Sequence, residues 1–209
     1  MTTSIRFDAS TDGLACMSSV FDPELNYTWA GWFRLAANNG TAYQTIAIVY
    51  CGGSAWDALY VDASRNLSVD VNGTMASTGD VLTIGTWYHL ALRRTATNAL
   101  EVYLDGTLTH TVTTSASGRN APSSMYLGLE EFGTWVNGNF AFWRLWEASI
   151  TTTELATEKD ATSAQRTTNL YADWNLQANA SDQSGNGRGW TEQGTVAYTE
   201  AGPSIGSGG

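Results

Sequence analysis

The sequence is poor in positive charge. Its 209 residues include a single lysine, Lys159, and 10 lysines and arginines together stand against 20 acidic residues, so the formal net charge is −10 at pH 7. A nucleic-acid partner would require a basic surface, and an anionic membrane surface would repel this chain. The composition therefore predicts no nucleic-acid partner and disfavours anionic membranes.

Long apolar runs are also lacking. No stretch approaches the roughly 18 apolar residues of a membrane-spanning helix. The N-terminal segment MTTSIRFDAS has neither the basic nor the apolar region of a secretory signal peptide. We therefore expect no membrane insertion and no cleaved signal, so that an extracellular or virion-surface location would be reached by another route.

Cysteine is scarce as well. Cys16 and Cys51 are the only two, with no CxxC motif and no histidine cluster beside them, which argues against zinc. The two could form one disulfide or remain as small buried thiols, and the sequence leaves both possibilities open.

The sequence is rich in segments whose residues alternate between two faces, the pattern of β-strands. Segment 27–35, YTWAGWFRL, alternates between two faces, and segment 100–114 reads as two such strands around Asp105-Gly106, a dipeptide typical of tight hairpins. Thr151 and Glu154 form a capping-box pattern that predicts one helix over 151–160. Further strands are expected at 45–50, 57–62, 66–71, 85–94, 124–129, 140–146, 169–176 and 195–200.

These elements predict an all-β fold, an antiparallel β-sandwich of two sheets with one short helix. No low-complexity break divides the chain, so residues 1–201 are expected to form a single domain. The glycine- and serine-rich end, 202–209, is expected to be a flexible tail.

The order of the segments resembles the laminin-G-like, concanavalin A-like lectin/glucanase superfamily. The resemblance implies a jelly roll of two antiparallel sheets, and it is carried by Trp32, Trp87 with His89, Tyr103 to Gly106, Leu127-Gly128, Gly138 to Trp146 and Ile150 to Leu155. Many members carry a block like residues 180–190, ASDQSGNGRGW, near the N-terminus, whereas here it comes last. Such a permuted order implies that the strands SIRFDAS and TVAYTE, near the two termini, are neighbours in one sheet.

The 180–190 block itself could be a turn or a metal site. A phosphate loop would lead into a helix, whereas this one leads into a β-like segment, so phosphate binding is rejected. Asp182 and Asn186 carry the oxygen ligands that calcium prefers, but an Asx-type turn fits the same residues. In related lectins a calcium-binding acid often lies in the strand that here reads NFAFWRLW, and the matching position is Ala141.

A hydrolase of this family would need paired carboxylates, and the sequence shows none. Glu130 and Glu131 are adjacent and would point to opposite faces of a strand. We therefore predict a protein that is not an enzyme. Sugar recognition asks only for exposed aromatic rings with polar neighbours, and the candidates are Trp56, Asp57, Glu131, Trp135 and Asn137. Trp29, Trp87 and Trp174 are instead expected in the core.

Two functions remain open at this point. One is a non-catalytic recognition module that binds a glycan or cell-surface polysaccharide in adhesion. The other is a structural or assembly protein, such as a phage capsid decoration, fibre or tail subunit, with protein partners or self-association.

Overall fold

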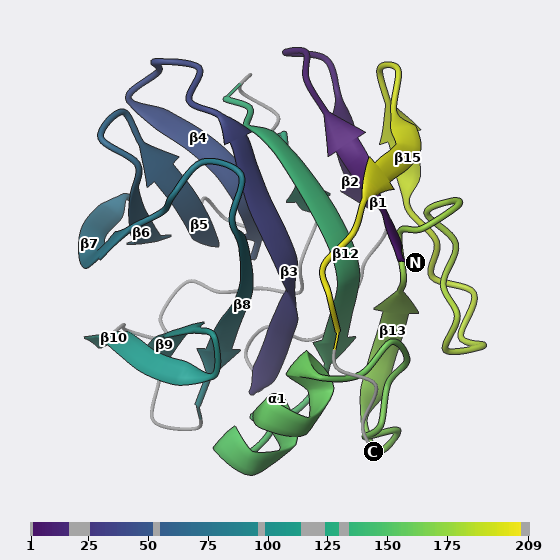
Figure 1. Cartoon of the computed structure of the whole chain (residues 1–209). Helices are drawn as coiled ribbons and strands as arrows, with labels where there is room; N and C mark the ends of the chain where they lie inside the picture. Colours follow the sequence, from purple (N-terminus) through teal and green to yellow (C-terminus); the bar gives the residue numbers. More distant parts are fainter. Residues whose placement is uncertain are drawn as a thin grey trace.

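The fold is a sandwich of two antiparallel sheets with one helix on an outer face (Figure 1), as predicted. The computed structural model describes residues 2–16, 26–51, 55–95, 99–113, 124–129 and 134–205.

The first sheet contains eight strands. Its order is β10 (Thr107–Thr113), β9 (Ala99–Leu104), β8 (Trp87–Arg94), β3 (Tyr27–Ala37), β12 (Asn137–Trp146), β1 (Thr3–Phe7) and β15 (Ala197–Ala201), and β13 (Leu170–Trp174) also pairs with β12. Helix α1 (Thr152–Lys159) packs on the outer face of this sheet, where Leu155 joins a small buried cluster with Ala30, Tyr103 and Trp146.

The second sheet contains seven strands. Its order is β14 (Thr191–Gln193), β2 (Gly13–Cys16), β11 (Ser124–Leu127), β4 (Tyr43–Tyr50), β5 (Trp56–Asp62), β6 (Asn66–Val71) and β7 (Thr74–Val81). The sequence did not predict β2, β7 or β14. Two of these are very short, and β7 is a mostly polar edge strand with little apolar alternation.

The strands near the two ends of the chain are neighbours in one sheet, as predicted. Strand β1 pairs with β15, with Ser4 opposite Glu200. The first residues of the expected tail continue this contact, because the backbone N–H of Gly202 donates to the carbonyl oxygen of Thr2 at 3.0 Å, and the hydroxyl of Thr2 donates to the carbonyl oxygen of Pro203 at 2.7 Å.

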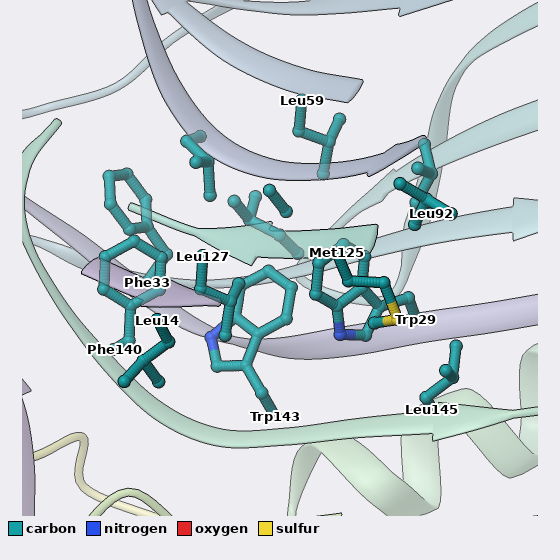
Figure 2. Close-up of a cluster of buried hydrophobic side chains, with 14 of the residues drawn as sticks. Leu14, Trp29, Phe33, Leu59, Leu92, Met125, Leu127, Phe140, Trp143 and Leu145 are labelled. Atoms are coloured by element: carbon teal, nitrogen blue, oxygen red, sulfur yellow. The ribbon is translucent and has the colours of Figure 1, made fainter. Parts of the chain in front are cut away.

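The core lies between the sheets and is rich in aromatic rings (Figure 2). Strand β3 turns Trp29 and Phe33 inward, where they meet Trp143 and Phe140 of β12, and the ring centroids of Trp29 and Trp143 are 5.4 Å apart. Gly31 is required here, since a Cβ at that position would lie 2.4 Å from the Trp143 ring. The close packing of an indole on bare backbone therefore accounts for the glycine in YTWAGWFRL.

Local signals in the sequence are also confirmed. Asp105 and Gly106 both have positive φ, 51° and 85°, as a two-residue hairpin turn needs. Thr151 is the N-cap of α1, and its side chain and that of Glu154 form the reciprocal capping box.

Two of the three tryptophans that were expected in the core are buried there, and one is not. Trp29 and Trp174 are buried, as predicted, but the prediction for Trp87 is wrong. Trp87 lies half-buried on the outer face of the first sheet, with the Arg34 guanidinium 5.3 Å from its ring centroid. Cys16 and Cys51 are both buried. No helix in the described part of the chain is long and apolar enough to cross a membrane.

Candidate functional site

The outer face of the seven-stranded sheet carries an aromatic surface. In β5 the side chains of Leu59 and Val61 enter the core, so alternation turns Tyr60 to the other face. Tyr43 of the neighbouring strand β4 lies beside it, with ring centroids 6.1 Å apart. Tyr43 is 44% exposed, so one of the two rings is open to solvent.

A cleft of about 290 Å³ opens on this surface, and it is lined by Tyr43, Tyr60, Asp70, Gly73, Met75 and Thr134. Four consecutive strands and the turn between β6 and β7 supply its sides, and the segment before β12 supplies Thr134. Strand β4 has an irregular register between Thr45 and Ala47 at this point. Such bulges are common beside binding sites because they change the direction in which side chains project.

Asp70 is the only ionisable acid among the described residues that line the cleft, and it is largely buried. Asp70 is 6% exposed, and its Oδ1 has no hydrogen-bond partner. Burial raises the pKa of Asp70, the N–H groups of Trp56 and Gly73 oppose that shift, and the charge of Asp57 adds to it. A buried acceptor without a donor is costly, so Asp70 is suited to receive a hydrogen bond from a bound molecule.

The predicted residue Trp56 lies beside this cleft. Its ring packs against the lining residue Gly73, since a Cβ added there would lie 3.7 Å from the indole. The backbone of Trp56 is fixed to the same turn: its N–H donates to Oδ1 of Asn72 at 2.9 Å, and its carbonyl accepts the N–H of Asn72 at 3.0 Å. The indole Nε1 lies near enough to Asp70 to lower its pKa, but the two groups do not meet hydrogen-bond geometry.

The predicted residue Trp135 is half-buried and directly follows the lining residue Thr134. Two contacts hold this segment in place. The hydroxyl of Thr134 bonds to that of Thr45, and the side-chain amide of Asn39 donates to the carbonyl oxygen of Trp135 at 2.8 Å. Of the two predicted aromatic residues, Trp56 therefore contacts a lining residue of the cleft, whereas Trp135 is the chain neighbour of another lining residue.

The expectation of a surface position for Asp57 is wrong. Its side chain is fully buried and points into the core, where its Oδ1 lies 2.6 Å from Nη2 of Arg94 and its Oδ2 accepts the hydroxyl of Tyr27 at 2.7 Å. The cause is the alternation of β5, which places Asp57 on the same face as Leu59 and Val61.

Asn137, another predicted sugar contact, is not among the described lining residues of the cleft. Asn137 begins β12 in the other sheet, opposite Ala37, and its buried Oδ1 has no partner. Glu131 lies outside the described residues, as does its neighbour Glu130.

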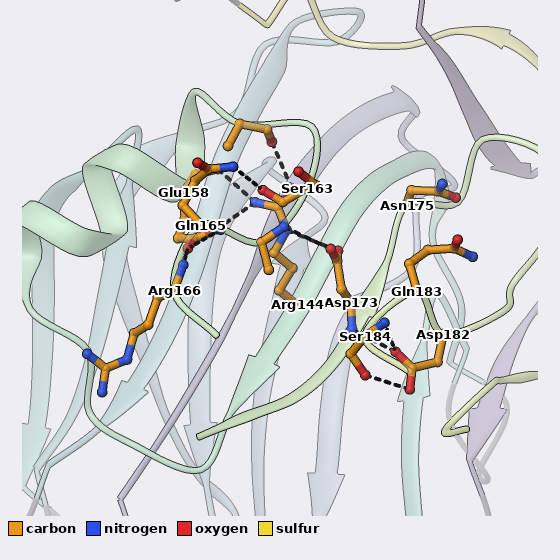
Figure 3. Close-up of polar contacts among 12 residues, drawn as sticks. Arg144, Glu158, Ser163, Gln165, Arg166, Asp173, Asn175, Asp182, Gln183 and Ser184 are labelled. Carbon is orange, nitrogen blue, oxygen red and sulfur yellow. Dashed lines mark hydrogen bonds and ion pairs between the residues drawn. The ribbon is translucent and has the colours of Figure 1, made fainter. Parts of the chain in front are cut away.

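The predicted metal loop is a turn held by hydrogen bonds (Figure 3). The Asp182 carboxylate accepts four: the backbone N–H groups of Asp173, Ser184 and Arg188, and the Ser184 hydroxyl at 2.8 Å. Burial acts to raise the pKa of Asp182, but these donors outweigh it and the pKa lies below its ordinary value. The side-chain amide of Asn186 donates to the carbonyl oxygens of Leu170 and Tyr171, both at 3.1 Å.

These contacts fit a turn better than a calcium site, because donor hydrogens surround the carboxylate. No group of three histidine, cysteine, aspartate or glutamate side chains within the described ranges could hold a metal ion. Calcium at Asp182 and Asn186 stays a prediction.

Substituting Asp182 by alanine is expected to lower the free energy of unfolding by about 2 kcal/mol, since it removes several charge-assisted hydrogen bonds. With a depressed folded-state pKa, this contribution is present above about pH 3.9 and is lost as the pH falls further. Thermal unfolding of both proteins with calcium and with chelator is the measurement. A calcium-dependent rise in Tm that disappears in Asp182→Ala would instead establish a calcium site.

A second hollow, of about 340 Å³, lies beside α1 and is lined by Glu154, Thr157, Glu158, Gln165, Arg166, Thr167 and Thr168. Its charged groups pair with one another or with the sheet beneath, although Nε of Arg166 is buried without a partner. Arg166 pairs with Glu154, and Glu158 pairs with Arg144 at 3.0 Å. The cleft at Asp70 is the stronger candidate because it alone of these two hollows has an aromatic wall, formed by Tyr43 and Tyr60.

Two antiparallel sheets packed as a jelly roll are typical of lectin domains, among others. The chain belongs to the concanavalin A-like lectin/glucanases superfamily, whose family model matches residues 8–156. This confirms the family that the sequence resembles. The chain has no match among curated protein sequences.

Several solved structures share the fold. A Bacteroides ovatus protein named for carbohydrate binding is 16% identical, with a TM-score of 0.68, and the match covers 99% of this chain and 62% of that one. Domain 4 of an extracellular arabinanase from Geobacillus stearothermophilus, in complex with arabinotriose, is 17% identical over 74% of this chain and 75% of that one, with a TM-score of 0.61. The CBM40 of a Ruminococcus gnavus sialidase, bound to α2,3-sialyllactose, is 13% identical over 74% and 95%, with a TM-score of 0.54. At these identities the likeness shows the fold alone.

Proposed function

We propose that this protein is a non-catalytic glycan-binding domain whose site is the cleft at Asp70. The observation that carries the proposal is Asp70, a residue that lines a cleft with Tyr43 and Tyr60 and whose buried Oδ1 lacks a donor. Aromatic faces pack against the C–H groups of a sugar ring, and a carboxylate accepts hydrogen bonds from sugar hydroxyls. The cleft brings both kinds of contact together.

The lining residues support binding rather than hydrolysis. Glycosidases of the common types place two carboxyl groups on either side of the scissile bond. Asp70 is the only carboxylate among the described residues of the cleft. The solved relatives that carry sugars support the same proposal, although fold by itself does not determine function. An assay for release of reducing sugar from glycan substrates would reveal any hydrolysis.

Substituting Tyr43 by alanine is expected to weaken glycan binding roughly threefold to tenfold, which is the effect of losing one aromatic stacking contact. A glycan array would first identify a ligand, and titration calorimetry would then give Kd for both proteins. Leu108→Ala is a matched control, because Leu108 is 47% exposed against 44% for Tyr43 and lies on β10 of the other sheet. Equal affinities for Tyr43→Ala and the unmodified protein, or no bound glycan of any class, would contradict the proposal.

A role in adhesion or in a larger assembly is a second candidate. Val81 and Leu108 are exposed apolar residues on the edge strands β7 and β10, which contact each other, so this rim of the sandwich could meet another protein. Native mass spectrometry at micromolar concentration distinguishes the two candidates. A stable symmetric oligomer that dissociates in Leu108→Glu would favour assembly, and a monomer would favour the glycan-binding domain alone.

A further inference from the structure

We infer that the cleft selects neutral sugars and discriminates against acidic ones, an inference that rests on the proposed function and specifies its ligand class. Two observations carry it. The described lining residues include an acid and no base, and an unpartnered donor lies next to an unpartnered acceptor at Trp56 and Asp70.

The charge of the cleft is the first step. A sialic or uronic acid carries a carboxylate, and proteins usually neutralise such a group with arginine or lysine. The cleft offers neither among its described lining residues, which are Tyr43, Tyr60, Asp70, Gly73, Met75 and Thr134. Because Asp70 is buried, a second negative charge near it would be poorly screened and repelled.

The surroundings of Asp70 add to this repulsion. Asp57 lies on the neighbouring strand β5. It is the chain neighbour of Ala58, the residue opposite Asp70. Its charge is felt at Asp70 even though Arg94 pairs with it. The chain as a whole has a net charge of −10, so long-range repulsion also disfavours acidic partners relative to neutral ones.

The hydrogen-bonding groups are the second step. Oδ1 of Asp70 lacks a donor, and the indole Nε1 of Trp56, which lies near that carboxylate, lacks an acceptor in hydrogen-bond geometry. A sugar hydroxyl can donate to the first and accept from the second at the same time. A carboxylate can only accept, and an ammonium group can only donate, so each would leave one of the two buried groups unsatisfied.

The experiment compares matched sugars on the complete protein. A glycan array that contains neutral, sialylated and uronate-bearing oligosaccharides identifies ligands, with lactose and 3′-sialyllactose as one matched pair. Titration calorimetry then gives Kd for the best neutral ligand and for its acidic counterpart. We expect the acidic sugar to bind at least tenfold more weakly.

Two variants separate charge from hydrogen bonding. Asp70→Asn removes the charge at nearly constant shape. In this variant the Kd of the acidic sugar is expected to exceed the Kd of its neutral counterpart by less than threefold. Trp56→Phe removes the Nε1 donor and is expected to weaken neutral binding several-fold while leaving the ratio of the two Kd values unchanged. Asp160→Asn, an exposed acid after α1, is the control and should leave both values as they are.

The possible results test the selectivity for neutral sugars separately from the proposed glycan binding on which it rests. Acidic sugars that bind as tightly as their neutral counterparts would overturn the selectivity and leave the proposed function standing. The selectivity would also be overturned if the ratio of the two Kd values were unchanged in Asp70→Asn, provided that an unchanged circular dichroism spectrum shows this variant to be folded. Failure of every neutral and acidic glycan to bind would overturn the proposed function and the selectivity together.

Discussion

Replacing Asp57 by alanine is expected to lower the free energy of unfolding by about 3–5 kcal/mol, the cost of breaking a buried ion pair by removing one partner. Asp57 is fully buried, and its carboxylate accepts hydrogen bonds from Nη2 of Arg94 at 2.6 Å and from Nε at 3.0 Å. The Tyr27 hydroxyl donates to the same carboxylate, and burial raises the pKa of that tyrosine well above its ordinary value.

The size of the effect follows from the position of this pair. Asp57 belongs to the seven-stranded sheet, whereas Arg94 and Tyr27 belong to the eight-stranded one, so the contact joins the two sheets through the core. In Asp57→Ala the guanidinium would remain buried without this carboxylate, and breaking a buried ion pair by removing one partner is costly. The double variant Asp57→Leu with Arg94→Leu removes both charges and should recover much of the loss.

Urea unfolding followed by tryptophan fluorescence measures the change, with Glu200→Ala as control. Glu200 pairs with Arg34 at 3.5 Å in a partly exposed setting, where the side chains are 48% and 20% exposed. Such surface pairs contribute about 1 kcal/mol or less. If Asp57→Ala cost no more than this control, the inter-sheet pair would not be a main support of the fold.

The fold was predictable because its signals are local. The alternation of YTWAGWFRL, the Asp105-Gly106 turn and the Thr151 capping box each depend on a few consecutive residues, and all three are found in the structure. Strand β7 escaped prediction because an edge strand buries little, so its residues need not alternate. Trp87 was misplaced because alternation shows which residues share a face without showing which face is inside.

The site was predictable only in part for the same reason. Trp56 and Trp135 stand out as aromatic residues near turns; Trp56 packs against the lining residue Gly73, and Trp135 follows the lining residue Thr134 in the chain. Asp57 was misjudged from its neighbour Trp56, although its alternation with Leu59 already pointed inward. Tyr60 and Asp70 come from separate strands, and only sheet register, with Asp70 opposite Ala58, shows that they share one surface.

Replacing Arg144 by methionine is expected to lower the free energy of unfolding by a similar amount, about 3–5 kcal/mol, and to release α1 from the sheet. Arg144 is 1% exposed and donates to the carboxylates of Asp173 and Glu158 at 3.1 and 3.0 Å (Figure 3). It also donates to the carbonyl oxygens of Glu158 and Ala161 at 2.9 and 2.8 Å. One side chain on β12 thus holds the end of the helix, the segment after it and strand β13.

The loss would be large because methionine would leave two buried carboxylates without their cation. Burial already raises the pKa of Glu158, and the Arg144 charge acts in the opposite direction. Without Arg144 that carboxyl group should take up a proton more readily in the folded state. A raised folded-state pKa means that the unfolded state binds fewer protons, so the variant should regain stability as the pH falls toward the ordinary glutamate range.

Hydrogen exchange of the α1 amides and urea unfolding at two pH values measure both effects. Arg166→Met is the matched control, because Arg166 pairs with Glu154 beside the same helix but is 25% exposed. The control should change the free energy of unfolding by less than about 1 kcal/mol. If Arg144→Met kept the α1 amides as protected as the control does, the helix would be held by Leu155 and its apolar neighbours, and the buried charges would be dispensable for its docking.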